Sequence, residues 1–160
     1  MVYALLRINY VEADTNSMKP IVKYIEHKPA EHTDRATAWI ARVWPSSSGR
    51  TLYFNDMALK RSSGYDSNHC DLVSGEDYWV SGVKKNGSNR HSNGGGPIYI
   101  EKSLVEWYEA YVHEKDFNGL IEIPDLAKPD ISKFNGIENE RIVESSDTSD
   151  ASTEADDVRG

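Results

Sequence analysis

The stretch RATAWIARVWPSSSGRTLYFNDMAL, residues 35–59, decides the expected fold. Its first ten residues alternate in side-chain direction, so that Ile40 falls on the opposite face of a strand from Trp39. Its last ten residues form a second run, in which Leu52 and Phe54 share a face. The segment PSSSG separates the two runs. Alternating runs around a Pro/Ser/Gly turn predict a β-hairpin.

Shorter runs of the same kind lie on both sides of this hairpin. Prolines or turn residues bound them, which favours strands over helices. Ser74-Gly75 is placed to turn between two of these runs, and Asn86-Gly87 to turn after the second. Asn-Gly suits a tight hairpin because both residues tolerate a positive φ. The predicted strands are ALLRINYVE (4–12), PIVKYIEHKP (20–29), HCDLV (69–73), DYWVSGV (77–83) and PIYIE (97–101).

One helix is predicted, over SLVEWYEAYVHEK, residues 103–115. Ser103 and Glu106 have the spacing of a capping box, which marks a helix start. Apolar side chains then recur at helical spacing, with charged residues away from that stripe. The segment therefore predicts an amphipathic helix packed on the β-rich part. The stripe consists of Leu104, Trp107, Tyr108, Tyr111 and Val112.

These elements predict a mainly β fold with one C-terminal amphipathic helix. A small SH3-like or OB-like barrel is the expected form, because closure removes exposed strand edges. An open antiparallel sheet with the helix on one face, an α+β arrangement, is the alternative. We assign residues 1–117 to a single β-rich globular domain and 118–138 to a partly ordered extension. Residues 139–160 form a predicted disordered acidic tail, since they hold too few apolar residues to offset the entropy of ordering.

The negative charge is concentrated near the C-terminus. Of the 160 residues, 1–117 carry 14 Lys/Arg and 15 Asp/Glu, whereas 118–160 carry 4 and 11. The net charge of −8 thus leaves a near-neutral body, and such a body is compatible with a nucleic-acid partner. The single cysteine, Cys70, excludes an intrachain disulfide and fits a cytoplasmic location. No apolar run approaches the ~20 residues of a membrane span, so no membrane partner is expected.

The segment GEDYWVSGVKKNGSNRHSNGGG, residues 75–96, is the candidate binding site. Lys and Arg can neutralise phosphates, glycine amides can approach them closely, and aromatic side chains offer a surface on which bases stack. The segment lacks the spacing of a P-loop and does not lead directly into a helix. Its alternative interpretation is a solvated hairpin tip with a glycine hinge and a core tryptophan. The candidate binding residues are Lys84, Lys85, Asn89, Arg90, His91, Tyr78 and Trp79.

Metal and catalytic patterns are weak. His27 and His32 are five residues apart with Pro29 between them, which excludes a helical zinc pair. His69, Cys70 and Asp71 are consecutive, and neighbours on a regular strand point to opposite faces. No Gly-x-Ser-x-Gly elbow is present. We therefore assign no catalytic residue, metal or cofactor; the sequence leaves open whether the chain is an enzyme and favours a non-enzymatic role.

The run GEDYWVSGVKKNGSNRHSNGGGPIYIEKSLVEWY, residues 75–108, resembles a segment of small uncharacterised bacterial proteins. The shared pattern is YWVSGVKKNGxxRH, preceded by an acidic pair and followed by a Gly-rich exit into an Ile-rich strand. The upstream GRTLYFNDMAL is similar to the strand before that segment, so the resemblance covers about residues 49–110. Ser92 stands where the pattern has an aromatic residue, which weakens a stacking role there. The resemblance implies a bacterial or phage origin and no known activity.

We thus predict a non-enzymatic binding module that binds nucleic acid, or another anionic ligand, through a basic Gly-rich hairpin. Lys84, Lys85 and Arg90 would contact phosphates, and Asn89 and the glycine amides would add hydrogen bonds. One alternative is a protein–protein interaction module, such as a regulator or inhibitor of a bacterial mobile element. A second alternative is a small hydrolase-type enzyme that uses His91 with a cysteine or a carboxylate.

Overall fold

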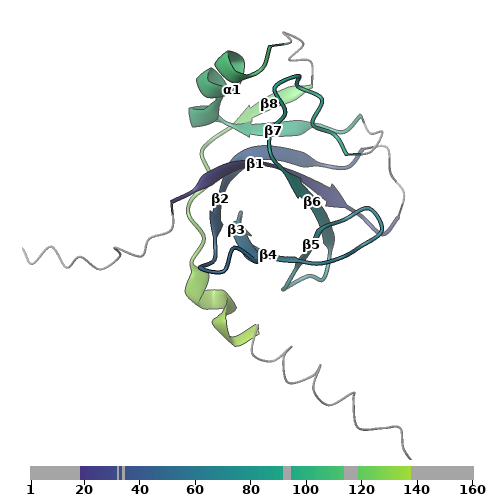
Figure 1. The fold of residues 1–160 in the computed structure, drawn as a ribbon, viewed down its shortest axis with the longest axis vertical. Helices are drawn as coiled ribbons and strands as arrows, with labels where there is room; N and C mark the ends of the chain where they lie inside the picture. The colour runs from purple at the N-terminus through teal and green to yellow at the C-terminus, as the bar shows by residue number, and fades with distance from the viewer. Residues whose placement is uncertain (1–18, 32, 34, 92–94, 114–118, 138–160) are drawn as a thin grey trace, which may run out of the picture.

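The structure is a computed structural model of the chain and describes residues 19–31, 33, 35–91, 95–113 and 119–137. Within these residues the chain is mainly β (Figure 1). None of the described helices has the length and apolar character that a membrane crossing requires. The elements are β1 (Ile21–Lys28), β2 (Ala38–Pro45), β3 (Thr51–Phe54), β4 (Met57–Arg61), β5 (His69–Asp71), β6 (Asp77–Ser81), β7 (Ile98–Glu101), the 3-10 helix η1 (Lys102–Leu104), α1 (Val105–Tyr111), β8 (Leu120–Ile123) and the 3-10 helix η2 (Ile131–Phe134).

Six strands close into an antiparallel barrel. Their order is β1-β6-β5-β4-β3-β2, and pairing of β1 with β2 completes the ring seen in Figure 1. Closure pairs β1 with β2, which would otherwise be the two edge strands of an open sheet. This removal of exposed edges is the physical reason to expect a barrel. The predicted mainly β fold with a small barrel is therefore confirmed, and the open-sheet alternative is wrong.

Two further strands extend the sheet beyond the barrel. The start of β2, from Ala38 to Ile40, pairs with β7, whereas its end, Trp44 and Pro45, pairs with β3. β8 then pairs with β7, and both of these added pairings are parallel. α1 lies over this extension in Figure 1, on the far side from η2. β8 falls within the stretch predicted only as a partly ordered extension.

Alternation along the strands separates the apolar core into three clusters. Ile25 of β1 belongs to the cluster inside the barrel, while its neighbour Tyr24 belongs to the cluster between the barrel wall and α1. Tyr108 of α1 lies in that second cluster. Trp44 of β2 packs with Phe134 of η2 in the third. The barrel is thus filled inside and covered on two parts of its outer surface.

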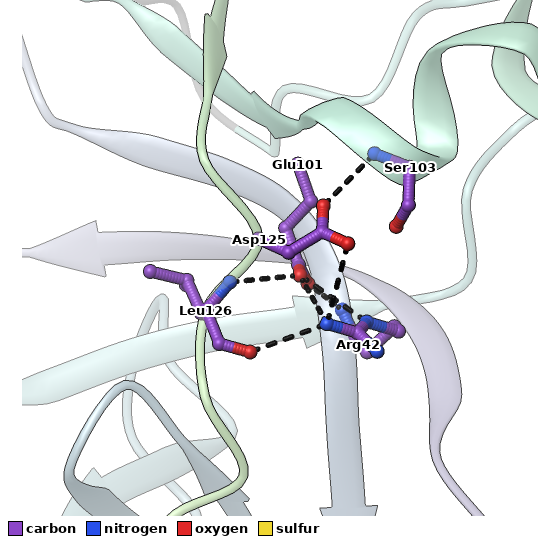
Figure 2. Close-up of polar contacts among 5 residues, drawn as sticks. All are labelled: Arg42, Glu101, Ser103, Asp125 and Leu126. Atoms are coloured by element: carbon purple, nitrogen blue, oxygen red, sulfur yellow. Dashed lines mark hydrogen bonds and ion pairs between the residues drawn. The ribbon is translucent and has the colours of Figure 1, made fainter.

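A buried carboxylate joins the extension to the barrel. Neither β7 nor β3 pairs with Arg42, and the Glu101 carboxylate accepts the Arg42 backbone N–H at 2.6 Å instead. It also accepts the Arg42 guanidinium at 2.8 Å and the Leu126 backbone N–H at 3.0 Å (Figure 2). Asp125 lies 3.8 Å from the same guanidinium and accepts the Ser103 backbone N–H. One carboxylate thereby holds β2, β7 and the chain after β8 together.

Two local predictions are wrong in their details. RTLYFNDMAL is not one strand but the hairpin β3–β4, which turns at Asn55 and Asp56 with φ of 44° and 57°. Asn and Asp are the residues after Gly that best tolerate this left-handed conformation. The helix α1 ends at Tyr111, and the predicted Ser103 cap does not form, because Leu104 precedes α1 and no side chain caps it.

The remaining strand and turn predictions divide into three groups. The strands predicted at 20–29, 69–73, 77–83 and 97–101 are confirmed as β1, β5, β6 and β7, with shorter bounds. Ser74-Gly75 does turn between β5 and β6, with Gly75 at a φ of 76°. The predicted strand over 4–12 and the acidic tail, 139–160, lie outside the described residues.

Candidate functional site

The loop after β6, residues 82–91, runs along the outside of the barrel. Figure 1 shows it leaving β6, crossing β1 and rising beside β7 and β8. Val83 enters the apolar cluster beneath α1, and the Lys85 backbone carbonyl accepts the His113 N–H at 2.9 Å. The His91 N–H donates to the Glu26 carboxylate at 3.0 Å. The loop is therefore attached at both ends to the wall that α1 covers.

Internal hydrogen bonds shape this loop into a closed turn. The Gly87 N–H donates to the Lys84 carbonyl at 3.0 Å, and Gly87 has a φ of 72°. The buried Asn89 side chain accepts the Lys84 N–H at 2.7 Å. These bonds take the place of a strand ladder, and among the described residues 88–91 and 95–97 no strand follows Asn86-Gly87 before β7. The turn prediction is correct, but the predicted hairpin is wrong.

Two adjacent lysines of the loop are exposed, and one of them, Lys85, lies beside an aromatic residue of α1. Lys84 and Lys85 are both exposed, and the Lys85 ammonium lies 5.7 Å from the ring centroid of Tyr111. Tyr111 stacks on Trp107, with centroids 4.9 Å apart and an interplanar angle of 18°. Trp107 is 37% exposed. We call these four residues, Lys84, Lys85, Trp107 and Tyr111, the Lys85–Trp107 face.

Arg90 directs its charge toward the backbone. Its guanidinium donates to the Ala36 carbonyl at 3.1 Å and to the Gly96 carbonyl. A Cβ at Gly96 would lie 2.4 Å from the Ala36 carbonyl oxygen, so the chain passes there too closely for any side chain. Arg90 thereby ties the loop to the residues before β2 and β7. Its structural role competes with the predicted role in phosphate contact.

Trp79 and His91 form a stacked pair on the outer wall. Their ring centroids are 3.6 Å apart with an interplanar angle of 16°, and His91 is exposed. Burial, together with the charge of Lys28, lowers the pKa of His91. Because the imidazole covers one face of Trp79, that face is not open to a base. Tyr78 points the opposite way, into the barrel core, where burial raises its pKa to about 12.

A buried carboxylate anchors the His91 end of the loop. Glu26 is 1% exposed and accepts from the Tyr24 hydroxyl at 2.8 Å, the Lys28 ammonium at 3.2 Å and the His91 N–H. Burial raises the pKa of Glu26, but these three donors and the Lys28 charge outweigh it, so the pKa lies below its usual value. An ionised carboxylate beneath the loop fixes where the loop ends.

The structure thus divides the predicted site residues. Lys84, Lys85 and His91 are exposed, Trp79 lies under His91, Asn89 and Arg90 hold the loop, and Tyr78 is inside the barrel. Trp107 and Tyr111 were predicted only as part of the packing stripe of the helix. Their spacing of four, at the margin of that stripe, was the available signal of an exposed aromatic pair.

The arrangement of the described side chains does not point to a metal site or a catalytic site. In the part of the chain that the structure describes, no three His, Cys, Asp or Glu side chains are placed to hold a metal ion. The Cys70 thiol donates to the Asp71 carbonyl at 3.6 Å. A comparison with protein-family models, curated proteins and solved structures finds no match to the chain.

Proposed function

We propose that the protein is a non-enzymatic module that binds single-stranded nucleic acid on the Lys85–Trp107 face. The observation that carries this proposal is the continuous arrangement of Lys85 over Tyr111 and of Tyr111 on the partly exposed Trp107. An unpaired base can stack on the open side of Trp107 while the lysines neutralise neighbouring phosphates. A cytoplasmic location, expected from the lone cysteine, gives access to such a partner.

The charge of the face favours a single strand over a duplex. Only two of its residues are cationic, and α1 carries the exposed Glu106 and Glu109 alongside them. Two lysines neutralise about two phosphates, so the logarithm of the binding constant should fall with the logarithm of salt concentration with a slope of about −1.4 for a single strand. Most of the affinity would then come from base stacking, which a duplex does not offer.

The experiment is a titration of a fluorescently labelled oligothymidylate with the full chain at low ionic strength, followed by the fluorescence anisotropy of the label. Trp107→Leu keeps an apolar side chain but removes the stacking surface, and it should weaken binding about tenfold. Lys85→Ala should weaken binding and make it less dependent on salt, whereas Lys60→Ala, on β4, should not.

Two results would reject this function. The first is no saturable binding to any single-stranded oligonucleotide at low salt. The second is binding that both Trp107→Leu and Lys85→Ala leave unchanged. Each variant is first compared with the wild type by its thermal midpoint, so that a loss of fold is not mistaken for a loss of contact.

A further inference from the structure

One end of the barrel contains a pocket of about 370 Å³. All six barrel strands contribute to its lining, so the pocket is the mouth of the barrel rather than a groove on its side. Its volume lies within the range of about 300–1,000 Å³ that is typical of small-molecule sites. The mouth shares no residue with the Lys85–Trp107 face.

The charged groups of the mouth are all basic. Lys23 of β1, Arg61 of β4 and His69 of β5 line it, and no Asp or Glu does. Among the described residues, neither Lys23 nor Arg61 forms an ion pair with a carboxylate. Burial, followed by the charges of Arg61 and Lys23, lowers the pKa of His69 to about 4. Two cations thus act on one partly enclosed space, and no carboxylate of the described residues pairs with either of them.

Apart from Asn68, the rest of the lining is apolar, and hydrogen bonds hold part of it in place. Leu52 and Val80 belong to the barrel core and form part of the wall. The Asn68 side chain accepts the Val80 N–H at 2.8 Å and donates to the Val80 carbonyl at 2.8 Å. Its oxygen also lies 2.8 Å from His69 Nδ1. This bonding fixes the positions of Asn68 and His69 before any ligand arrives.

We propose that the barrel mouth binds a small organic anion, whose charged group lies between Lys23 and Arg61 and whose apolar body contacts Leu52 and Val80. Unpaired cations in a partly enclosed pocket bind an anion more strongly than they do in open solvent. A phosphate ester and a carboxylate share this chemistry, and the experiment separates them. This small-molecule site is separate from the Lys85–Trp107 face, and the proposal does not depend on nucleic-acid binding.

The experiment is calorimetry of the full chain with four probes: phenyl phosphate, inorganic phosphate, benzoate and benzyl alcohol. We expect phenyl phosphate to bind more tightly than inorganic phosphate, because only the ester reaches the apolar wall, and benzyl alcohol not to bind. Benzoate binding as tightly as phenyl phosphate would identify a carboxylate ligand, and weaker benzoate binding would identify a phosphate ester.

Variants then locate the site. Lys23→Met and Arg61→Gln keep much of the side-chain volume and should each weaken binding about tenfold. Lys60→Met and Arg35→Gln remove the same charge away from the mouth and should leave the affinity unchanged. Should Arg61→Gln fail to fold, Arg61→Lys, which keeps the charge, should fold and bind. The proposal is overturned if no anionic probe binds at low ionic strength, or if binding survives in the Lys23→Met/Arg61→Gln double variant.

Discussion

His69 is a titratable side chain that the fold keeps neutral. It is 6% exposed, its Nδ1 lies within hydrogen-bond distance of the Asn68 side-chain oxygen, and it stands opposite Tyr78 in the β5–β6 pairing. Arg61 and Lys23 face it from β4 and β1. Burial, and after it these two charges, lowers the pKa of His69 from its ordinary value of 6.5 to about 4.

This shift makes the stability of the protein depend on pH. Because the folded pKa of His69 is depressed, the unfolded chain takes up the proton first as the pH falls. His69 therefore has no effect on stability well above pH 6.5, and it lowers the unfolding free energy as the pH falls from 6.5 towards about 4. The loss reaches about 3 kcal/mol below both values.

The measurement is urea unfolding of the wild type and His69→Asn across this range. Asn keeps a donor near the position of Nδ1 and does not titrate. The difference between the two proteins at about pH 8 gives the packing cost of the substitution, and His69→Asn should lose about 2 kcal/mol less than the wild type between about pH 7 and pH 5. A difference that stays constant down to pH 4 would show that His69 titrates normally.

At the scale of elements, the contact between Arg42 and Glu101 joins segments that are far apart in the sequence. The Glu101 carboxylate is fully buried, and the Arg42 side chain is 29% exposed. Removing one partner of a buried pair leaves the other charge without compensation, which is more costly than removing both. The cost should therefore depend on which partner is removed and on whether the other remains.

We expect Arg42→Met to lower the unfolding free energy by about 3 kcal/mol, because it leaves the Glu101 carboxylate buried with only two backbone donors. Adding Glu101→Gln should recover part of that loss. Lys133→Met is the control, since the Lys133–Asp56 pair is exposed on both sides and should contribute nothing measurable. Additive effects of Arg42→Met and Glu101→Gln in denaturant unfolding would contradict this coupling.

The local sequence patterns predict where the strands lie, but they do not predict which strands pair with one another. Alternation located β1, β2 and β6, because side-chain direction within a strand is a local property. The same rule places Tyr78 and Trp79 on opposite faces, so these two residues could never both have joined one binding surface. The parallel pairing of β7 and β8 joins segments separated by a helix, and no local pattern specifies such a pairing.

The candidate site was predictable only in part, for the same reason. The exposed lysines follow from composition and from the Asn86-Gly87 turn. The role of Arg90 depends on the carbonyls of Ala36 and Gly96, which the fold alone brings to its guanidinium. The barrel mouth depends on strands β1, β4 and β5 meeting at one end. Both arrangements depend on the tertiary structure, and the periodicity of the sequence does not predict them.

At the scale of the whole molecule, charge is divided between a near-neutral body and an acidic C-terminal segment. Residues 139–160 hold two Arg and seven Asp/Glu. If the proposed function holds, this segment competes with nucleic acid for the Lys85–Trp107 face, because its carboxylates and the phosphates are both negatively charged and bind the same lysines. Such competition between exposed charges acts over about 10 Å at 0.1 M salt and over about 3 Å at 1 M.

The final prediction concerns a full-length variant in which these seven acidic residues are changed to Asn and Gln. Its affinity for an oligothymidylate should rise severalfold at low ionic strength and converge on that of the wild type at high salt, because screening removes the competition. Fluorescence titration across a salt series measures both effects. In a Lys84→Ala/Lys85→Ala background the gain should largely disappear, since the cations for which the two anions compete are absent. Equal affinities at every salt concentration would instead indicate a segment that contributes only to solubility.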